Sequence, residues 1–223
     1  MVMRVPFSID DFFAVFERYN SDIWPLQLIF YALAIIAIVG LMMKLKNASQ
    51  MLNQLLSFLW LWMGIVYHIN YFASINPAAN FFGGMFIMQG LIFAYLSVNK
   101  TKLEYRFNLT NIHSIVGIGF IVYGMVLYPL LNYLSGITFP RSPTFGLPCP
   151  STIFTFGLLL IATRKIPWYI FIIPFLWSLI GFSAALTLSI EQDLVLGITG
   201  VVSVVLILLR KTQVTSGSPR VSL

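Results

Sequence analysis

The sequence predicts an all-α integral membrane protein with seven transmembrane helices. The first reason is composition, because 59% of the 223 residues are hydrophobic and only 9% are charged, whereas about 25% of a soluble domain is charged. The second is the segment 47–99, which contains no Lys, Arg, Asp or Glu and is long enough for two membrane-spanning helices. The third is that basic loops alternate with loops of low basic content between the apolar segments. We therefore expect a lipid bilayer to be the principal partner.

A short helix is expected first, at residues 8–19. Ser8 is suited to cap its N-terminus, and Asp10 and Asp11 suit its first turn, where the helix dipole favours acidic side chains. Apolar side chains recur at helical spacing, at Ile9, Phe12, Phe13 and Phe16. Two placements are open: an amphipathic helix lying in the membrane interface, or a helix packed on the outer end of the bundle.

Seven apolar segments follow, each expected to cross the bilayer. The expected spans are residues 24–43, 51–75, 79–98, 112–134, 149–163, 167–189 and 194–209. A crossing needs about 20 apolar residues, so the fifth segment is at the short end. Together the spans form a single domain at residues 1–211, and the polar residues 212–223 are expected to be a disordered cytoplasmic tail.

Basic residues are distributed unequally between the two sets of loops. One set carries Lys44, Lys46, Lys100, Lys102, Arg106, Arg164, Lys165, Arg210, Lys211 and Arg220, and the other carries Arg4, Arg18 and Arg141. The positive-inside rule then predicts a multi-pass protein of the plasma (inner) membrane, with the N-terminus outside and the C-terminus in the cytoplasm. The basic residues form no single patch, so no nucleic acid partner is expected.

The two halves of the chain share features that favour a duplication of three helices on either side of a fourth. Phe58-Leu59-Trp60 precedes Gly64 at the same offset at which Phe175-Leu176-Trp177 precedes Gly181. Such parallel halves are related by an axis along the membrane normal. Chance similarity between apolar segments would give the same matches, so this 3+1+3 arrangement stays a hypothesis.

Two polar residues of the charge-free segment, His68 and Gln89, are the first candidates for substrate binding. Polar groups are costly in hydrocarbon unless they have partners, so both side chains are expected to face the bundle interior. Each could bind a solute, but each could instead hydrogen-bond a neighbouring helix, and we favour this helix-joining role for both. The further candidates for substrate binding are Trp62, Tyr67, Asn70, Asn76, Cys149 and Thr152.

The segment 140–150 is rich in proline and cannot be helical throughout. We expect residues 146–150 to fold inward over the outer end of the bundle, to pack near His68 and to close an outward-facing cavity. The alternative is a loop that lies flat on the surface, with His68 bonded only to a neighbouring helix. For Cys149 itself, a rigid outer plug is favoured over a nucleophilic or metal-binding pair with His68. Glu191 and Asp193, expected in the adjacent outer loop, would make the mouth of the cavity negative and favour cations or neutral polar solutes.

No carboxylate is expected in mid-membrane, which favours facilitated diffusion over proton-coupled transport. The sequence accordingly predicts a transporter or channel for a small polar solute or cation. The alternative function is a non-transporting accessory or sensor subunit of a membrane complex. A homo-oligomer or a membrane complex is left open as the assembly that the chain forms. An intramembrane enzyme using His68 and Cys149 is the least favoured hypothesis, so we expect no enzymatic activity, no cofactor and no metal site.

Several short motifs resemble those of a known family. They are Trp62, Gly64, Tyr67-His68, Phe72, Ile75-Asn76-Pro77-Ala78, Gln89-Gly90 and Gly146-Leu147-Pro148-Cys149-Pro150. From Phe7 to Arg210 the chain is similar to a family of prokaryotic multi-spanning membrane proteins that is described as a domain of unknown function. The resemblance implies a membrane location and adds no activity.

Overall fold

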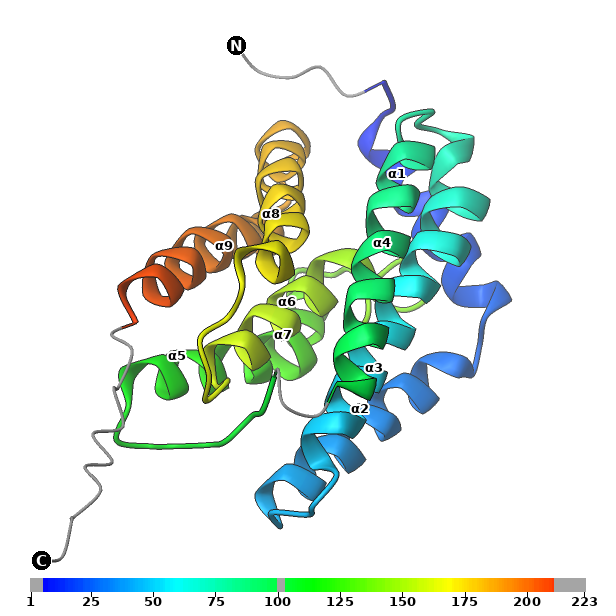
Figure 1. Ribbon diagram of the computed structural model, residues 1–223. Helices are drawn as coiled ribbons and strands as arrows, with labels where there is room; N and C mark the ends of the chain where they lie inside the picture. Colours follow the sequence, from blue (N-terminus) through cyan, green and yellow to red (C-terminus); the bar gives the residue numbers. More distant parts are fainter. Residues whose placement is uncertain (1–5, 100–102, 211–223) are drawn as a thin grey trace, which may run out of the picture.

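The structure is a computed structural model that describes residues 6–99 and 103–210. Within those ranges the regular elements are helices and no β-strand forms (Figure 1), which confirms the predicted all-α class. The predicted tail at residues 212–223 lies outside the described residues. So do five of the basic residues used to predict the orientation, namely Arg4, Lys100, Lys102, Lys211 and Arg220.

Helix α1 (Ile9–Asp22) packs on the rest of the bundle. Ser8 and Asp11 form a capping box, in which the Asp11 amide donates to Ser8 Oγ at 3.1 Å and the Ser8 amide donates to the Asp11 carboxylate at 3.0 Å. The hydrogen bonds from Ser8 stabilise the charged carboxylate and lower the pKa of Asp11. The apolar face is buried, through Phe12, Phe13, Val15, Phe16 and Tyr19. The apolar face of α1 therefore packs on the bundle, and the position of the helix relative to a membrane stays a prediction.

The remaining helices follow the apolar segments of the sequence. Helix α2 (Leu26–Met42) is set at 81° to α1. The next elements are α3 (Ala48–Trp62), the π-helix η1 (Met63–Tyr71), the short 3₁₀-helix η2 (Phe72–Ser74) and α4 (Ala79–Val98). They are followed by α5 (Ile112–Val122), the π-helix η3 (Tyr123–Leu127), α6 (Tyr128–Leu134), α7 (Pro148–Leu160), α8 (Trp168–Leu188) and α9 (Glu191–Leu209). Long π-helical segments are rare and often occur at functional sites.

By length and composition, five helical segments of the described chain could cross a membrane. They are Ala48–Ser74, Ala79–Val98, Ile112–Leu134, Trp168–Leu188 and Glu191–Leu209. The bent pair α1 and α2 would raise the count to six if it forms one broken span. These helices suggest a membrane protein, but the predicted count of seven is not reached, because α2 has 17 residues and α7 has 13.

Helix α7 is short because it lies inside the molecule. Every residue from Pro148 to Leu160 is buried, and the helix packs against α5, η3, α8 and α9. The sequence predicted a span at 149–163 that would draw on Phe145–Pro148 to reach the surface. The helix instead ends at Leu160, and Ala162 forms an isolated β-bridge with Tyr105.

The helices form two groups, α1–α4 and α5–α9, which stand apart at the right and left of Figure 1. In the first group, α3 and η1 approach α4 closely, and a Cβ added at Gly64 would lie 2.8 Å from the Gly83 carbonyl oxygen. The groups meet where α4 packs on α8 and where the Trp60 indole N–H donates to Thr155 Oγ1 at 3.1 Å. The first and second halves of the chain thus pack as separate units with a shared interface.

The loops predicted to lie on the same side of a membrane meet in space. At one end of the molecule Arg164 pairs with Glu104 at 3.4 Å, and Arg210 donates to the Ala162 carbonyl oxygen at 2.6 Å. Burial lowers the pKa of Arg210. At the other end, the Asn20 amide donates to the carbonyl oxygens of Pro140 and Ser142, at 2.7 and 2.8 Å. These contacts join described loops that the sequence assigned to the same side of the membrane.

Candidate functional site

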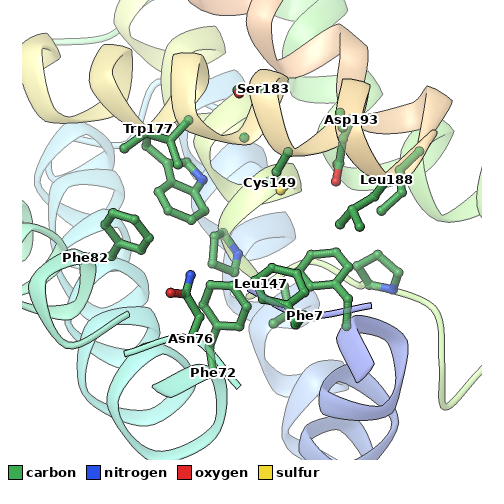
Figure 2. Close-up of a pocket in the computed structure, with 18 of the residues that line it drawn as sticks. Phe7, Phe72, Asn76, Phe82, Leu147, Cys149, Trp177, Ser183, Leu188 and Asp193 are labelled. Carbon is green, nitrogen blue, oxygen red and sulfur yellow. The ribbon is translucent and has the colours of Figure 1, made fainter. Parts of the chain in front are cut away.

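A cavity of about 210 Å³ lies between the two groups of helices. Its wall includes residues of α1, η1, η2 and the start of α4 on one side, and of the 143–149 segment, α8 and the start of α9 on the other (Figure 2). Because both groups line it, a relative movement of the groups would change its shape and access.

Aromatic side chains form the wall on the α1–α4 side. Phe12 and Phe16 lie one turn apart on α1, with ring centroids 4.6 Å apart. Phe12 meets Phe72 edge-on at 5.9 Å, and Tyr67 stacks on both Phe16 and Phe72, at 5.9 and 5.8 Å. These edge-on and stacked pairs are favourable geometries for aromatic rings. Aromatic pairing therefore holds this wall together, and it offers ring faces and edges to a ligand.

Asp193 provides an acidic group on the opposite wall. It lies in the first turn of α9 and its side chain is only 4% exposed. The Tyr128 hydroxyl donates to its carboxylate at 2.5 Å, and Cys149 lines the same cavity. Figure 2 shows Cys149 and Asp193 together on one side of the cavity, with Phe7 and Phe72 on the other. The cavity thus combines aromatic walls with one buried carboxylate that accepts a hydrogen bond from Tyr128.

The predicted position of Asp193 in an exposed outer loop is wrong. The sequence placed the start of the last helix at residue 194, where the continuous apolar run begins, but α9 starts at Glu191. Acidic side chains are favourable in the first turn of a helix, so a helix can begin before its apolar run. Glu191 is exposed and does not line the cavity, whereas Asp193 does.

The segment 146–150 turns inward and contributes Leu147, Pro148 and Cys149 to the cavity wall. Gly146 has a φ of +100°, and a Cβ there would lie 2.3 Å from Phe30, so glycine is required at this turn. Helix α7 begins at Pro148, where a missing amide hydrogen costs nothing. Cys149 shares the cavity wall with Asp193, whereas His68 does not line the cavity. The predicted approach of this segment to His68 stays a prediction.

His68 is fully buried in η1, as expected, but it joins no helix by a hydrogen bond. Neither of its ring nitrogens has a partner within the described parts of the chain. Its neighbours are aromatic, with ring centroids 4.5 Å away at Phe86 and 5.0 Å away at Trp177. The helix-joining hydrogen bond that we favoured for His68 is wrong. The side chain lies behind the aromatic wall and does not line the cavity.

Gln89 has the helix-joining role that we favoured. It is fully buried in α4, and its amide nitrogen donates to the Ile170 carbonyl oxygen on α8 at 3.0 Å. This bond joins the two helix groups. Because a side-chain amide satisfies a carbonyl of another helix here, Gln89 stabilises the interface rather than the cavity wall.

The other predicted residues divide between the cavity and the scaffold. Tyr67 and Asn76 line the cavity. Trp62 does not, since its indole N–H donates to the Tyr19 hydroxyl at 2.8 Å and ties α3 to α1. Asn70 is exposed, and Thr152 is buried in α7 away from the cavity lining.

Sequence reasoning missed the aromatic walls and Tyr128. Trp177 lines the cavity, although the sequence used it only as part of the possible repeat. Tyr128 binds Asp193 from a position 65 residues away, and no local pattern indicates such a pair. Within residues 6–99 and 103–210, no group of three or more His, Cys, Asp and Glu side chains could hold a metal ion.

Comparison with known proteins gives a family but no activity. A family model with the description "Family of unknown function (DUF6064)" matches residues 9–218. This match confirms the resemblance to a family of unknown function that the sequence motifs indicated. No curated protein and no solved structure matches the chain.

Proposed function

The chain belongs to the DUF6064 family of unknown function, and from this premise we propose that it is a membrane carrier of small organic cations. The observation that carries the proposal is the cavity between the two helix groups, in which aromatic walls face a buried carboxylate. Movement of the solute would be facilitated diffusion. The chain would hold the cation and carry out no reaction on it.

The residues that line the cavity favour organic cations over other classes of solute. A cation over an aromatic face is attracted by the ring quadrupole, and the attraction is strongest where water is excluded. Phe72, Phe82 and Trp177 supply such rings, and Asp193 supplies the opposite charge. The largely apolar lining suits a cation with an apolar body. An anion would face the repulsion of Asp193, and none of the described residues that line the cavity is basic.

The arrangement of the helices supports carriage. We propose seven crossings, with α2 and α7 included, an outer N-terminus and a cytoplasmic C-terminus in the plasma membrane. The parallel duplication remains part of the proposal. Gly64 contacts α4 and Gly181 contacts α9 through Leu196, so each repeat glycine sits against the helix that follows it in its own half. Movement of one half against the other would alternate access to the cavity.

The test uses the full-length protein in liposomes loaded with trimethyl(2-phenylethyl)ammonium, a permanently charged aromatic cation. We expect wild-type protein to release this probe faster than empty liposomes do. Binding is followed separately by tryptophan fluorescence, since Trp177 lines the cavity. Asp193→Asn keeps the size of the side chain and removes its charge, and we expect it to weaken binding by about 30-fold or more.

Glu191→Gln is the matched control, because Glu191 is an exposed acid in the same helical turn that does not line the cavity. It should bind and release the probe as wild type does. Equal losses in the two variants, or no binding by folded wild-type protein, would refute the proposed site. Binding without release would overturn carriage and support the accessory or sensor subunit instead.

A further inference from the structure

A second cavity, of about 620 Å³, opens at the end of the molecule where basic residues gather. Its wall is formed by the connection between α2 and α3, the start of α3, the last turn of α4 near Ser97, the segment 103–107 and Thr163. This cavity is separate from the one that holds Asp193, and the two share no lining residue.

The lining of this cavity carries uncompensated positive charge. Lys44, Lys46 and Arg106 all line it. Glu104 also lines it, but its carboxylate is paired with Arg164 at 3.4 Å. Among the described residues, no carboxylate forms an ion pair with Lys44, Lys46 or Arg106. An anionic ligand would therefore meet three cationic side chains.

The floor of the cavity is held by buried hydrogen bonds. The Tyr105 amide donates to Ser49 Oγ at 3.1 Å, and the Tyr105 hydroxyl donates to Asn53 Oδ1 at 2.6 Å. Tyr105 and Asn53 are only 4% and 2% exposed. Burial raises the pKa of Tyr105, so its phenol stays neutral and remains a donor. The Arg106 amide donates to the Ile161 carbonyl oxygen at 3.1 Å, which fixes the backbone that carries its guanidinium.

The start of α3 adds backbone donors to the same wall. Asn47, Ala48, Ser49 and Gln50 line the cavity, and the Asn47 side chain makes no capping hydrogen bond. The first amides of a helix generally lack acceptors in a preceding turn and carry the positive end of the helix dipole. The Ala48 amide donates to the Leu45 carbonyl oxygen at 3.1 Å, which leaves the amides of Ser49 and Gln50. They favour an anion at the same place as the three basic side chains.

We propose that this cavity binds a phosphate group, carried either by an anionic phospholipid or by a small soluble molecule. The cavity lies where the apolar parts of α3 and α4 end, the depth at which a lipid headgroup would lie beside helices that cross a bilayer. Basic pockets at this depth are suited to phosphate headgroups. The inference does not depend on cation carriage, because the two cavities share no residue.

The test uses the full-length detergent-solubilised protein and two probes. Native mass spectrometry compares retention of phosphatidylglycerol with that of phosphatidylcholine, and calorimetry measures binding of inorganic pyrophosphate. Lys46→Gln and Arg106→Gln each remove one charge from the cavity. Each should weaken binding of the preferred probe by about fivefold, and the double variant should weaken it by about 25-fold. Thermal unfolding confirms that each variant is folded.

Lys165→Gln is the matched control, because Lys165 is exposed, follows Arg164 at the same end and does not line the cavity. It should change binding by less than about twofold. Charge-sensitive retention of phosphatidylglycerol alone assigns the cavity to a lipid, and charge-sensitive binding of pyrophosphate assigns it to a soluble phosphate. An equal loss in Lys165→Gln, or no binding of either probe by wild type, would overturn the proposal.

Discussion

The two cavities lie toward opposite ends of one continuous helical segment, Ala48–Ser74, and they differ in how their charge is held. In the cavity between the helix groups, one carboxylate is buried and accepts a hydrogen bond from Tyr128. In the basic cavity, several charges lie on flexible side chains near water, around a floor of buried hydrogen bonds. A buried charge is screened less than an exposed one, so the single carboxylate should matter more per charge than each lysine.

The largest effect, on stability as well as on binding, should come from a substitution at the close contact between η1 and α4. A Cβ at Gly83 would lie 2.7 Å from Ile69 and 2.9 Å from the Gly64 carbonyl oxygen. We expect Gly83→Ala to destabilise the protein by about 1–3 kcal/mol and to weaken ligand binding at the cavity between the helix groups more than at the basic cavity. Chemical denaturation in detergent measures the free energy of unfolding.

The neighbouring glycine provides the control for this prediction. A Cβ at Gly84 would meet no atom within 4 Å. Gly84→Ala should leave stability unchanged or raise it by up to about 1 kcal/mol, because alanine favours a helix more than glycine does. If both variants lose stability equally, close packing at Gly83 is not the cause.

A smaller effect, confined to the cavity between the helix groups, is expected from Tyr128→Phe. The variant removes the hydroxyl that donates to Asp193 at 2.5 Å and leaves the ring in place. We expect binding of trimethyl(2-phenylethyl)ammonium to weaken by about tenfold, because a hydrogen bond to a charged group is worth about 1.5–3 kcal/mol. Tyr133→Phe, on an exposed side chain of α6, should not change binding. Pyrophosphate binding at the basic cavity should be the same in both variants.

The smallest effect on ligand binding is expected from added salt. Salt should weaken binding more at the cavity with exposed charges than at the cavity with a buried charge. Raising the ionic strength from about 0.1 M to about 1 M shortens the Debye length from about 10 Å to about 3 Å. Anion binding at the basic cavity should then fall severalfold, because Lys44, Lys46 and Arg106 are exposed. Cation binding beside the buried Asp193 should change much less. Equal salt dependence at both sites would contradict the contrast drawn between them.

The sequence was informative where one residue type has a strong local preference. Ser8 and Asp11 indicated the start of α1, and the gap between the expected spans 51–75 and 79–98 agrees with the break before α4. The cost of polar groups in hydrocarbon correctly indicated that His68 and Gln89 are buried. Each of these inferences depends only on residues that are close together in the sequence or on the cost of placing a polar group in hydrocarbon.

Partners that are distant in the chain could not be predicted. Asp193 was assigned to a loop because its burial depends on Tyr128 and Cys149, which approach it only in the folded molecule. His68 looked like a hydrogen-bonding residue because its type suggests a partner, whereas its shell of Phe82, Phe86 and Trp177 comes from two other helices. The aromatic wall could not be predicted either, because phenylalanine is equally suited to lipid-facing and interior positions.

The burial of α7 has a consequence for biogenesis. Its 13 residues extend for about 20 Å, less than the roughly 30 Å of hydrocarbon in a bilayer, so the proposed crossing at α7 needs the residues that flank the helix. Because the helix is enclosed by α5, η3, α8 and α9, lipid is not its final environment, and two of its four neighbours are synthesised after it. During translation α7 must therefore wait beside the insertion machinery, or in a temporary lipid position, until α8 and α9 emerge and enclose it. The last helices of the chain thus complete the environment of a helix made before them.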